Sequence, residues 1–165
     1  MVKRRKDSNN RVLKAGESER KQGGYQFRWN TGDGKRHYVY AKDLKELRAK
    51  EKEIIHDMDD GIRTDNMNLT LNDLYNIWTD VKKGLKPNTF NNYKYMYDHF
   101  VQESLGKYKV RTLHRTDIKR FYNHLIDIDG LKINTVGTIH LIIHQILQLA
   151  VEDDILRKNV SDNGL

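Results

Sequence analysis

Hydrophobic and polar residues alternate in two short stretches of the N-terminal third. Tyr25–Trp29 carries a ring at every second position, Asn30–Gly34 holds turn-forming residues, and residues 35–41 alternate again. Alternation with a period of two is typical of a half-buried strand, and a glycine-containing turn between two such stretches predicts a β-hairpin. A further short strand is predicted at residues 11–14, inside a basic stretch, residues 1–22, that is interpreted as a flexible arm.

A change of period follows the hairpin. Between residues 42 and 60 the apolar residues recur at helical spacing among charged ones, which predicts an amphipathic helix covering one face of the sheet. Gly61 is expected to end this helix, and the polar residues from there to Asn68 are the best candidate for a linker. The apolar positions of the predicted helix are Leu44, Leu47, Ile54, Ile55 and Met58.

From residue 69 to residue 159 the pattern is helical throughout. Four apolar stripes predict four helices, and the breaks between them fall at Pro87, Gly106, Arg115–Asp117 and Gly130. The stripes are Leu71, Leu74, Tyr75 and Trp78; then Phe90, Tyr93, Tyr97, Phe100 and Val101; then Ile118, Phe121, Tyr122 and Leu125; and last Ile139, Ile142, Ile143, Ile146 and Ala150.

The predicted fold class is therefore α+β. We expect a small three-stranded antiparallel sheet with one helix in residues 1–62, a linker in residues 63–68, and an all-α four-helix domain in residues 69–160. Residues 161–165 are expected to begin a further linker, toward a domain that this chain does not include.

Charge adds a candidate partner to this picture. The chain holds 30 Lys and Arg against 23 Asp and Glu, and residues 1–36 alone hold 11 against 4, so the positive charge gathers at the N-terminus. A basic surplus of this kind favours association with a polyanion. Cysteine is absent and no apolar stretch has membrane-spanning length, which predicts a cytoplasmic protein without a membrane role.

The strand pattern assigns a face to each residue of the hairpin. If Phe27 and Val39 point toward the helix, the opposite face is basic and aromatic, which suits phosphate contacts and base edges in a major groove. A solvated polar face is the alternative, and the neighbouring basic arm favours DNA. The outward residues are Gln26, Arg28, Arg36, Tyr38 and Tyr40.

The second predicted helix of residues 69–159 carries several asparagines opposite its apolar stripe. Asparagine is unfavourable within helices but is a good reader of adenine edges, so a DNA-facing role is one interpretation; an ordinary exposed face with Asn88 as a cap is the other. This outer face comprises Asn88, Asn91, Asn92, Tyr95 and His99, and the fourth helix similarly exposes Asn134, His144 and Gln148.

Sites of other kinds are not indicated. His140 and His144 have metal-binding spacing, but a third ligand is missing, and Gly32-Asp33-Gly34 lacks the third glycine of a dinucleotide-binding loop. The acidic clusters at residues 57–60 and 152–154 lie near predicted helix ends, where solvated turns are usual. We therefore expect no catalytic residues, no metal and no cofactor.

Two groups of motifs resemble a known family. Residues 16–21, Tyr25–Trp29 and His37–Tyr40 resemble the arm-site-binding domain of conjugative-transposon integrases, which are tyrosine recombinases of the phage-integrase type. Leu69-Thr70-Leu71, Lys86–Thr89, Asn134-Thr135 and Leu156–Asn159, with Trp78, Tyr93 and Leu105-Gly106, resemble the helical, SAM-like core-binding domain of the same enzymes. Val160 stands where the family usually has proline.

The resemblance implies a three-stranded sheet that enters the major groove at arm-type DNA, and a helical domain whose second and fourth helices face the crossover site. Double-stranded DNA and other integrase protomers are the implied partners. By the resemblance, Arg20, Lys21, Arg28 and Tyr40 fall at arm-contacting positions. With the outward-facing residues of the hairpin, the candidate arm contacts are Arg20, Lys21, Arg28, Arg36, Tyr38 and Tyr40, and the candidate core contacts on and beside the second and fourth helices are Lys86, Asn88, Thr89, Asn91, Asn92, Tyr95, Asn134, Thr135, His144 and Gln148.

The family's catalytic domain carries the nucleophilic tyrosine and an Arg/Lys/His/Arg cluster, and no His-x-x-Arg occurs in this sequence. The chain is expected to be inactive alone and to serve a recombinase that integrates and excises a mobile element. One alternative is a stand-alone regulator or recombination directionality factor that binds DNA without cutting it. Another is a protein-interaction module whose helical bundle docks a partner helix.

Overall fold

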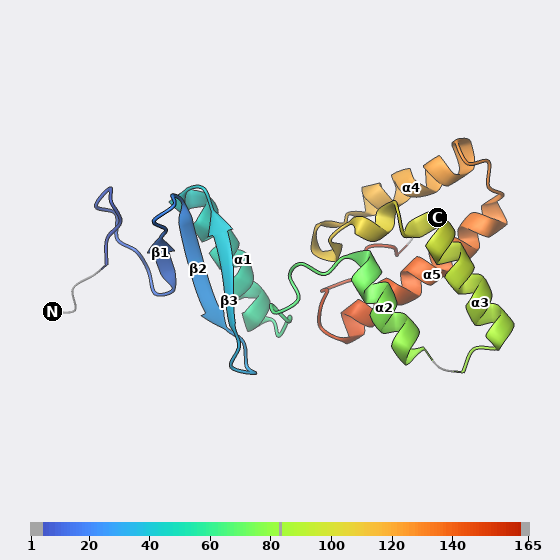
Figure 1. Cartoon of the computed structure of the whole chain (residues 1–165), viewed down its shortest axis with the longest axis horizontal. Coiled ribbons are helices and arrows are strands. Elements are labelled where there is room, and N and C mark those ends of the chain that lie inside the picture. Colours follow the sequence, from blue (N-terminus) through green and yellow to red (C-terminus); the bar gives the residue numbers. More distant parts are fainter. Residues whose placement is uncertain (1–4, 83, 163–165) are drawn as a thin grey trace. The chain divides into compact units, whose positions relative to one another are not determined.

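The computed structural model describes residues 5–82 and 84–162, and the chain divides into two compact units, residues 1–65 and 66–165 (Figure 1). The first four residues of the predicted arm and the last three residues of the chain lie outside the described part. In the first unit an antiparallel sheet in the order β1-β2-β3 packs beside one helix. The elements are β1 (Glu17–Glu19), β2 (Tyr25–Asn30), β3 (Arg36–Ala41) and α1 (Leu44–Asp59). The predicted sheet and helix are confirmed.

In the β2–β3 hairpin Phe27 lies opposite Val39 and Arg28 lies opposite Tyr38. The core of this unit is small. It is formed by rings from β2 and by aliphatic side chains from α1. Asp43 caps the start of α1, because its side chain accepts the backbone N–H of Glu46. The buried apolar residues are Tyr25, Phe27, Trp29, Leu44, Leu47 and Ile54.

Three expectations for the first unit were wrong. The first strand is Glu17–Glu19 and not residues 11–14, where Val12 forms only an isolated bridge with Lys6. The described part of the predicted flexible arm is folded against the sheet, because buried polar groups fasten it there. On α1, Ile55 and Met58 are exposed, because the helix turns other residues, acidic ones included, toward the sheet.

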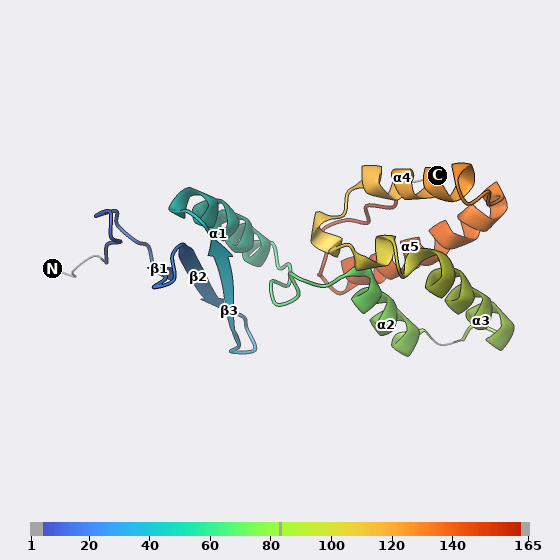
Figure 2. The same cartoon turned by 45° about the horizontal axis from the view of Figure 1, so that its top comes forward.

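The second unit is helical. Its elements are α2 (Leu71–Val81), α3 (Pro87–Met96), a π-helical turn η1 (Tyr97–Val101), two 3₁₀ turns η2 (Leu105–Lys107) and η3 (Val110–Thr112), α4 (Arg115–Asp127) and α5 (Ile133–Glu152). Both views show α5 running between α4 on one side and α2 on the other (Figures 1 and 2). A helix in this position buries most of its circumference, which accounts for its apolar sequence.

The predicted helix starts are confirmed, and the sequence explains them. Thr70 and Asp73 form a capping box before α2, Pro87 occupies the first position of α3, and the Asp117 carboxylate accepts the backbone N–H of His114 before α4. The second predicted helix does not continue to Gly106. It changes to π-helical hydrogen bonding at Tyr97 and gives way to turns after Val101.

Candidate nucleic-acid interface

The outer face of the first unit's sheet carries the predicted mixture of cations and rings. Along β2 the burial alternates, with Tyr25, Phe27 and Trp29 buried and Arg28 exposed, and along β3 Tyr38 and Tyr40 are 43% and 49% exposed. Arg36 is exposed and Gln26 is half-buried. The predicted assignment of faces is confirmed, because the rings that alternate with Arg28 form the core.

Arg20 and Tyr40 are brought together although twenty positions separate them. The guanidinium of Arg20 lies 4.7 Å from the centroid of the Tyr40 ring, a cation–π contact, and Lys21 beside it is exposed. The Lys50 ammonium on α1 donates to the backbone carbonyl of Tyr40 at 2.9 Å. These contacts place an arginine and an exposed tyrosine at one end of the sheet face before any ligand binds.

A buried ion pair fastens β1 to α1 beneath this face. The Arg48 guanidinium contacts the fully buried Glu17 carboxylate at 2.8 Å, and the backbone N–H of Lys14 donates to the same carboxylate at 2.7 Å. Burial raises the pKa of Glu17, but these bonds and a hydrogen bond with Glu51 outweigh it and hold the pKa below its ordinary value. Sequence reasoning missed this pair, because a glutamate is rarely assigned to a core.

Glu51 lies beside this pair between β1 and α1. Its side chain is buried, and the Lys14 ammonium reaches it only at 4.0 Å. Burial raises the pKa of Glu51, and its interaction with the Glu17 carboxylate raises it further. The two buried acids are therefore coupled, and their pKa values are moved in opposite directions.

A second polar cluster fastens the residues that precede β1. The Asp7 carboxylate accepts the backbone N–H groups of Asn9 and Arg11, pairs with the Arg11 guanidinium at 2.7 Å and accepts the Tyr25 hydroxyl at 3.1 Å. Burial raises the pKa of Asp7, yet the bonds from Arg11 and Tyr25 lower it below its ordinary value. The basic segment is thus ordered on the sheet without DNA.

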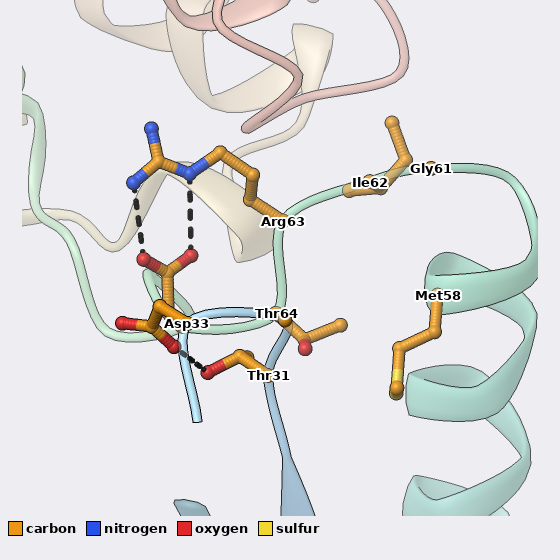
Figure 3. A pocket seen from close by; sticks show the side chains of 9 residues that line it. Thr31, Asp33, Met58, Gly61, Ile62, Arg63 and Thr64 are labelled. Atoms are coloured by element: carbon orange, nitrogen blue, oxygen red, sulfur yellow. Dashed lines mark hydrogen bonds and ion pairs between the residues drawn. The ribbon is translucent and has the colours of Figure 1, made fainter. Parts of the chain in front are cut away.

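A polar hollow lies where the β2–β3 turn meets the end of α1 (Figure 3). Arg63 and Asp65 pair across two nitrogen–oxygen contacts of 3.3 and 3.0 Å, and the Thr31 hydroxyl donates to Asp33. Trp29 donates its indole N–H to the buried Thr64 hydroxyl at 2.9 Å. The Trp29–Thr64 bond fastens this segment to the sheet, whereas the Arg63–Asp65 and Thr31–Asp33 bonds each lie within one turn.

In the second unit, α3 and η1 present the predicted asparagine face. Asn88, Asn91 and Asn92 are exposed, as are Lys86 at the start of the helix and Tyr95, whose ring stacks on His99 with centroids 5.5 Å apart. Thr89 is half-buried. No side chain caps α3, since Lys86 rather than Asn88 occupies the cap position. The face therefore offers unused amide groups beside an exposed aromatic pair.

The corresponding prediction for α5 was only partly right. Asn134 is exposed and Thr135 is half-buried, but His144 and Gln148 are half-buried and bonded, because residues after α5 fold back over them. The buried Asn159 amide donates to the backbone carbonyl of His144 at 3.0 Å, and His144 contacts the Ser161 hydroxyl at 3.1 Å. His144 and Gln148 thus hold the chain's last described residues.

Other chemistry finds little support in the described residues. His140 contacts the Tyr122 hydroxyl at 3.0 Å, and burial, together with the nearby His144, lowers its pKa below the ordinary value. No group of three potential metal ligands occurs in the described part of the chain. Within those same residues, no helix has the length and apolarity needed to cross a membrane.

Family models match both units. Residues 1–58 match the DNA binding domain of Tn916 integrase, and residues 70–126 match the N-terminal SAM-like domain of phage integrase. The chain is thus similar, in this order, to an integrase DNA-binding domain and to the SAM-like domain of phage integrases. The integrase DNA-binding domain accounts for the basic sheet face, and the SAM-like domain accounts for the helical bundle.

Curated relatives align with most of the chain. The chain is 27% identical to the transposase of transposon Tn916 from Enterococcus faecalis and to that of Tn1545 from Streptococcus agalactiae, across 98% of the chain and 43% of each relative. It is 29% identical to a XerC-like tyrosine recombinase of Caldanaerobacter subterraneus across 73% of the chain and 31% of the relative. The chain spans less than half the length of these relatives.

Solved structures share the fold of the integrase region. A lambda integrase tetramer bound to a Holliday junction matches 93% of the chain and 47% of its own chain, with a TM-score of 0.54 and 17% identity. A lambda integrase dimer bound to a core site matches with the same TM-score and 16% identity. This likeness supports the α+β architecture in which the sheet unit precedes the helical unit.

Proposed function

We propose that this chain holds and positions DNA for a tyrosine recombinase that integrates and excises a mobile element. The sheet unit would bind arm-type sites and the helical unit crossover-type sites, with further integrase protomers alongside, in a cytoplasmic, DNA-associated complex. The catalytic steps belong to the remainder of the recombinase. The observation that carries the proposal is the sheet face with Arg28, Tyr38 and Tyr40 exposed on a domain that matches an integrase DNA-binding domain.

The physical basis of the sheet contact is the pairing of charge with rings. Arg28 can donate two parallel hydrogen bonds to a guanine edge or neutralise a phosphate, and the exposed tyrosine hydroxyls can donate to phosphates. A β-ribbon fits the width of the major groove. Arg20 is held against Tyr40 before binding, so less side-chain entropy is lost when the two meet DNA.

In the helical unit the proposed contacts are largely uncharged. The exposed amides of Asn88, Asn91 and Asn92 match the donor and acceptor pair of adenine, and Tyr95 offers an apolar surface beside them. Lys86 supplies a cation at the start of the same helix. Because His144 and Gln148 hold the chain's last described residues, Asn134 is the strongest candidate on α5.

The test is a comparison of three variants of the chain. Arg28→Ala and Tyr40→Ala should each weaken duplex binding by about 1–3 kcal/mol if the side chains reach bases, with little change in the melting temperature. Lys45→Ala, on the exposed surface of α1, is the matched control and should bind as the wild type does. Fluorescence anisotropy measures the affinity. Equal losses in all three variants, or none, would contradict the proposed interface.

A further inference from the structure

The basic residues of the helical unit are concentrated in one short segment. Residues 66–165 hold 13 Lys and Arg, and six of these lie between residues 107 and 120, a segment whose single acidic residue is Asp117. The remainder of the unit holds seven basic and ten acidic residues. Surfaces of soluble domains usually intersperse the two signs, so a single-sign segment points to an anionic ligand.

The helix α4 arranges part of this segment on its outer surface. Its apolar stripe, Ile118, Phe121, Tyr122 and Leu125, is buried in the core. Residues four apart lie on the same side of a helix, so the opposite side carries two parallel rows, and every residue in them is exposed. We call the N-terminal part of this surface the α4 face; its rows are Arg115, Lys119 and Asn123, and Thr116 and Arg120, and the exposed Asp127 and His124 continue them toward the end of the helix.

The cations of the α4 face are available to a ligand. Arg115 and Lys119 form no hydrogen bond or ion pair with the described residues, and Arg120 approaches Asp117 only at 3.9 Å, with 82% of its side chain exposed. Asp117 meanwhile accepts the backbone N–H of His114 at the start of the helix. An anion at this surface would therefore be bound by side chains and not by the end of the helix.

We propose that the α4 face is a second DNA-contact surface of the helical unit and binds the phosphate backbone of a duplex without reading its sequence. The proposal rests on the proposed function. Arginine, lysine, threonine and asparagine are donors that commonly contact phosphates. Protein interfaces instead have an apolar centre, and the five residues of the α4 face include no apolar side chain.

The surface differs from the asparagine face of α3 in what it offers DNA. There the exposed groups are mainly amides and an aromatic pair, which suit base edges, whereas the α4 face offers charge and hydroxyl or amide donors. Contacts that position the protein and contacts that read bases are commonly separate groups in one complex. The helical unit would thus obtain its electrostatic affinity from α4.

A salt titration of the whole chain tests the proposal. Arg115→Gln with Lys119→Gln should reduce the slope of log affinity against log salt by about 2 on a short random-sequence duplex, because two phosphate contacts are lost. Lys132→Gln with Lys158→Gln removes the same charge elsewhere in the unit and should leave the slope nearly unchanged. Equal slopes in both double variants would overturn the proposal. If Arg28→Ala still weakens binding in that case, the proposed function survives.

Tethered cleavage locates the surface directly. Because the chain has no cysteine, Asn123→Cys provides a unique attachment point for an iron-chelate cleavage reagent, and Asn76→Cys on α2 is the matched control. Cutting of bound duplex from position 123, well above that from position 76, is the expected result. Equal cutting or none would overturn the proposal. A third outcome would favour an acidic protein partner and also overturn the proposal. In that case poly-glutamate binds the wild type but not Arg115→Gln/Lys119→Gln, while the wild type and the variant bind DNA with equal affinity.

Discussion

Among the described residues, the sheet unit buries six apolar side chains together with Asp7, Glu17, Glu51, Asp57 and Thr64, while the helical unit buries 22 apolar side chains and, as polar ones, only Asn159 and Ser161. A unit of about sixty residues cannot bury enough apolar surface for a large core. Its elements are joined instead by buried ion pairs and hydrogen bonds. The comparison teaches that two neighbouring domains of one chain can carry candidate DNA-binding surfaces on cores of different physical character.

Among the predictions, removal of core volume should produce the largest difference in stability between the two units. Ile143 on α5 is fully buried, so Ile143→Ala should lower the free energy of unfolding of the helical unit by about 2–5 kcal/mol through lost burial and the cavity left behind. Hydrogen exchange measured peptide by peptide should show faster exchange in residues 66–162 and unchanged protection in the sheet. A comparable loss in β2 and β3 would mean that the units do not unfold independently.

The next largest effect is expected in the sheet unit. Arg48→Met keeps the length of the side chain but leaves the Glu17 carboxylate buried without its ion-pair partner, and should lower the stability of this unit by about 1–3 kcal/mol. Lys52→Met, an exposed neighbour on α1, is the control and should have little effect. Denaturation followed by hydrogen exchange measures both. If the two variants change the stability of the sheet unit equally, the buried ion pair does not make the expected contribution to that stability.

Between pH 7 and pH 5 the stabilities of the two units should change by smaller amounts and in opposite directions. His140 has a lowered pKa, so the unfolded chain takes up a proton near pH 6.5 while the folded one does not, and the helical unit loses stability as the pH falls. Glu51 has a raised pKa, so the folded carboxyl binds its proton first, and the sheet unit gains stability as the pH falls toward 4.5. Hydrogen exchange at several pH values resolves the units.

Substitution of each titrating group provides the control for this pH dependence. His140→Asn should flatten the response of the helical unit, and Glu51→Gln, which imitates the protonated acid, should flatten that of the sheet unit. Below about pH 4 the sheet unit should lose stability in turn, since Asp7 and Glu17 have lowered pKa values and their carboxylates become protonated there. Parallel curves for both units from pH 7 to pH 5 would contradict these assignments.

Much of the fold follows from periodicity alone. The hairpin, the outward position of Arg28 and the starts of the helices were predicted because each depends on residues close together in the sequence. The position of β1 was not, because Glu17 becomes a strand residue only when Arg48, thirty-one positions later, neutralises its buried carboxylate. Local patterns carry no information about such a partner.

Residues of the candidate sites were likewise predicted where local sequence decides their exposure and missed where distant residues do. Exposure of the α3 asparagines was predicted from the apolar stripe opposite them. For His144 and Gln148 the stripe predicted the correct side of α5, but a helical period cannot show that residues 159–161 return to cover that side. The cations of the α4 face were visible in the sequence, and only the burial of Ile118 and Phe121 shows that several of them share one exposed surface.

The hydrogen bond between Trp29 and Thr64 also limits the length of unfastened chain between the two units. It fastens the chain to the sheet at Thr64, and in the helical unit the side chain of Asn68 accepts the Lys109 ammonium and the backbone carbonyl of Leu69 accepts the N–H of Val110, so three residues, 65–67, remain between the fastened points. Three extended residues reach only about 10 Å. Once one unit is bound, so short a tether gives the other a high effective concentration, and it restricts simultaneous binding to DNA segments that bending or assembly has brought close together.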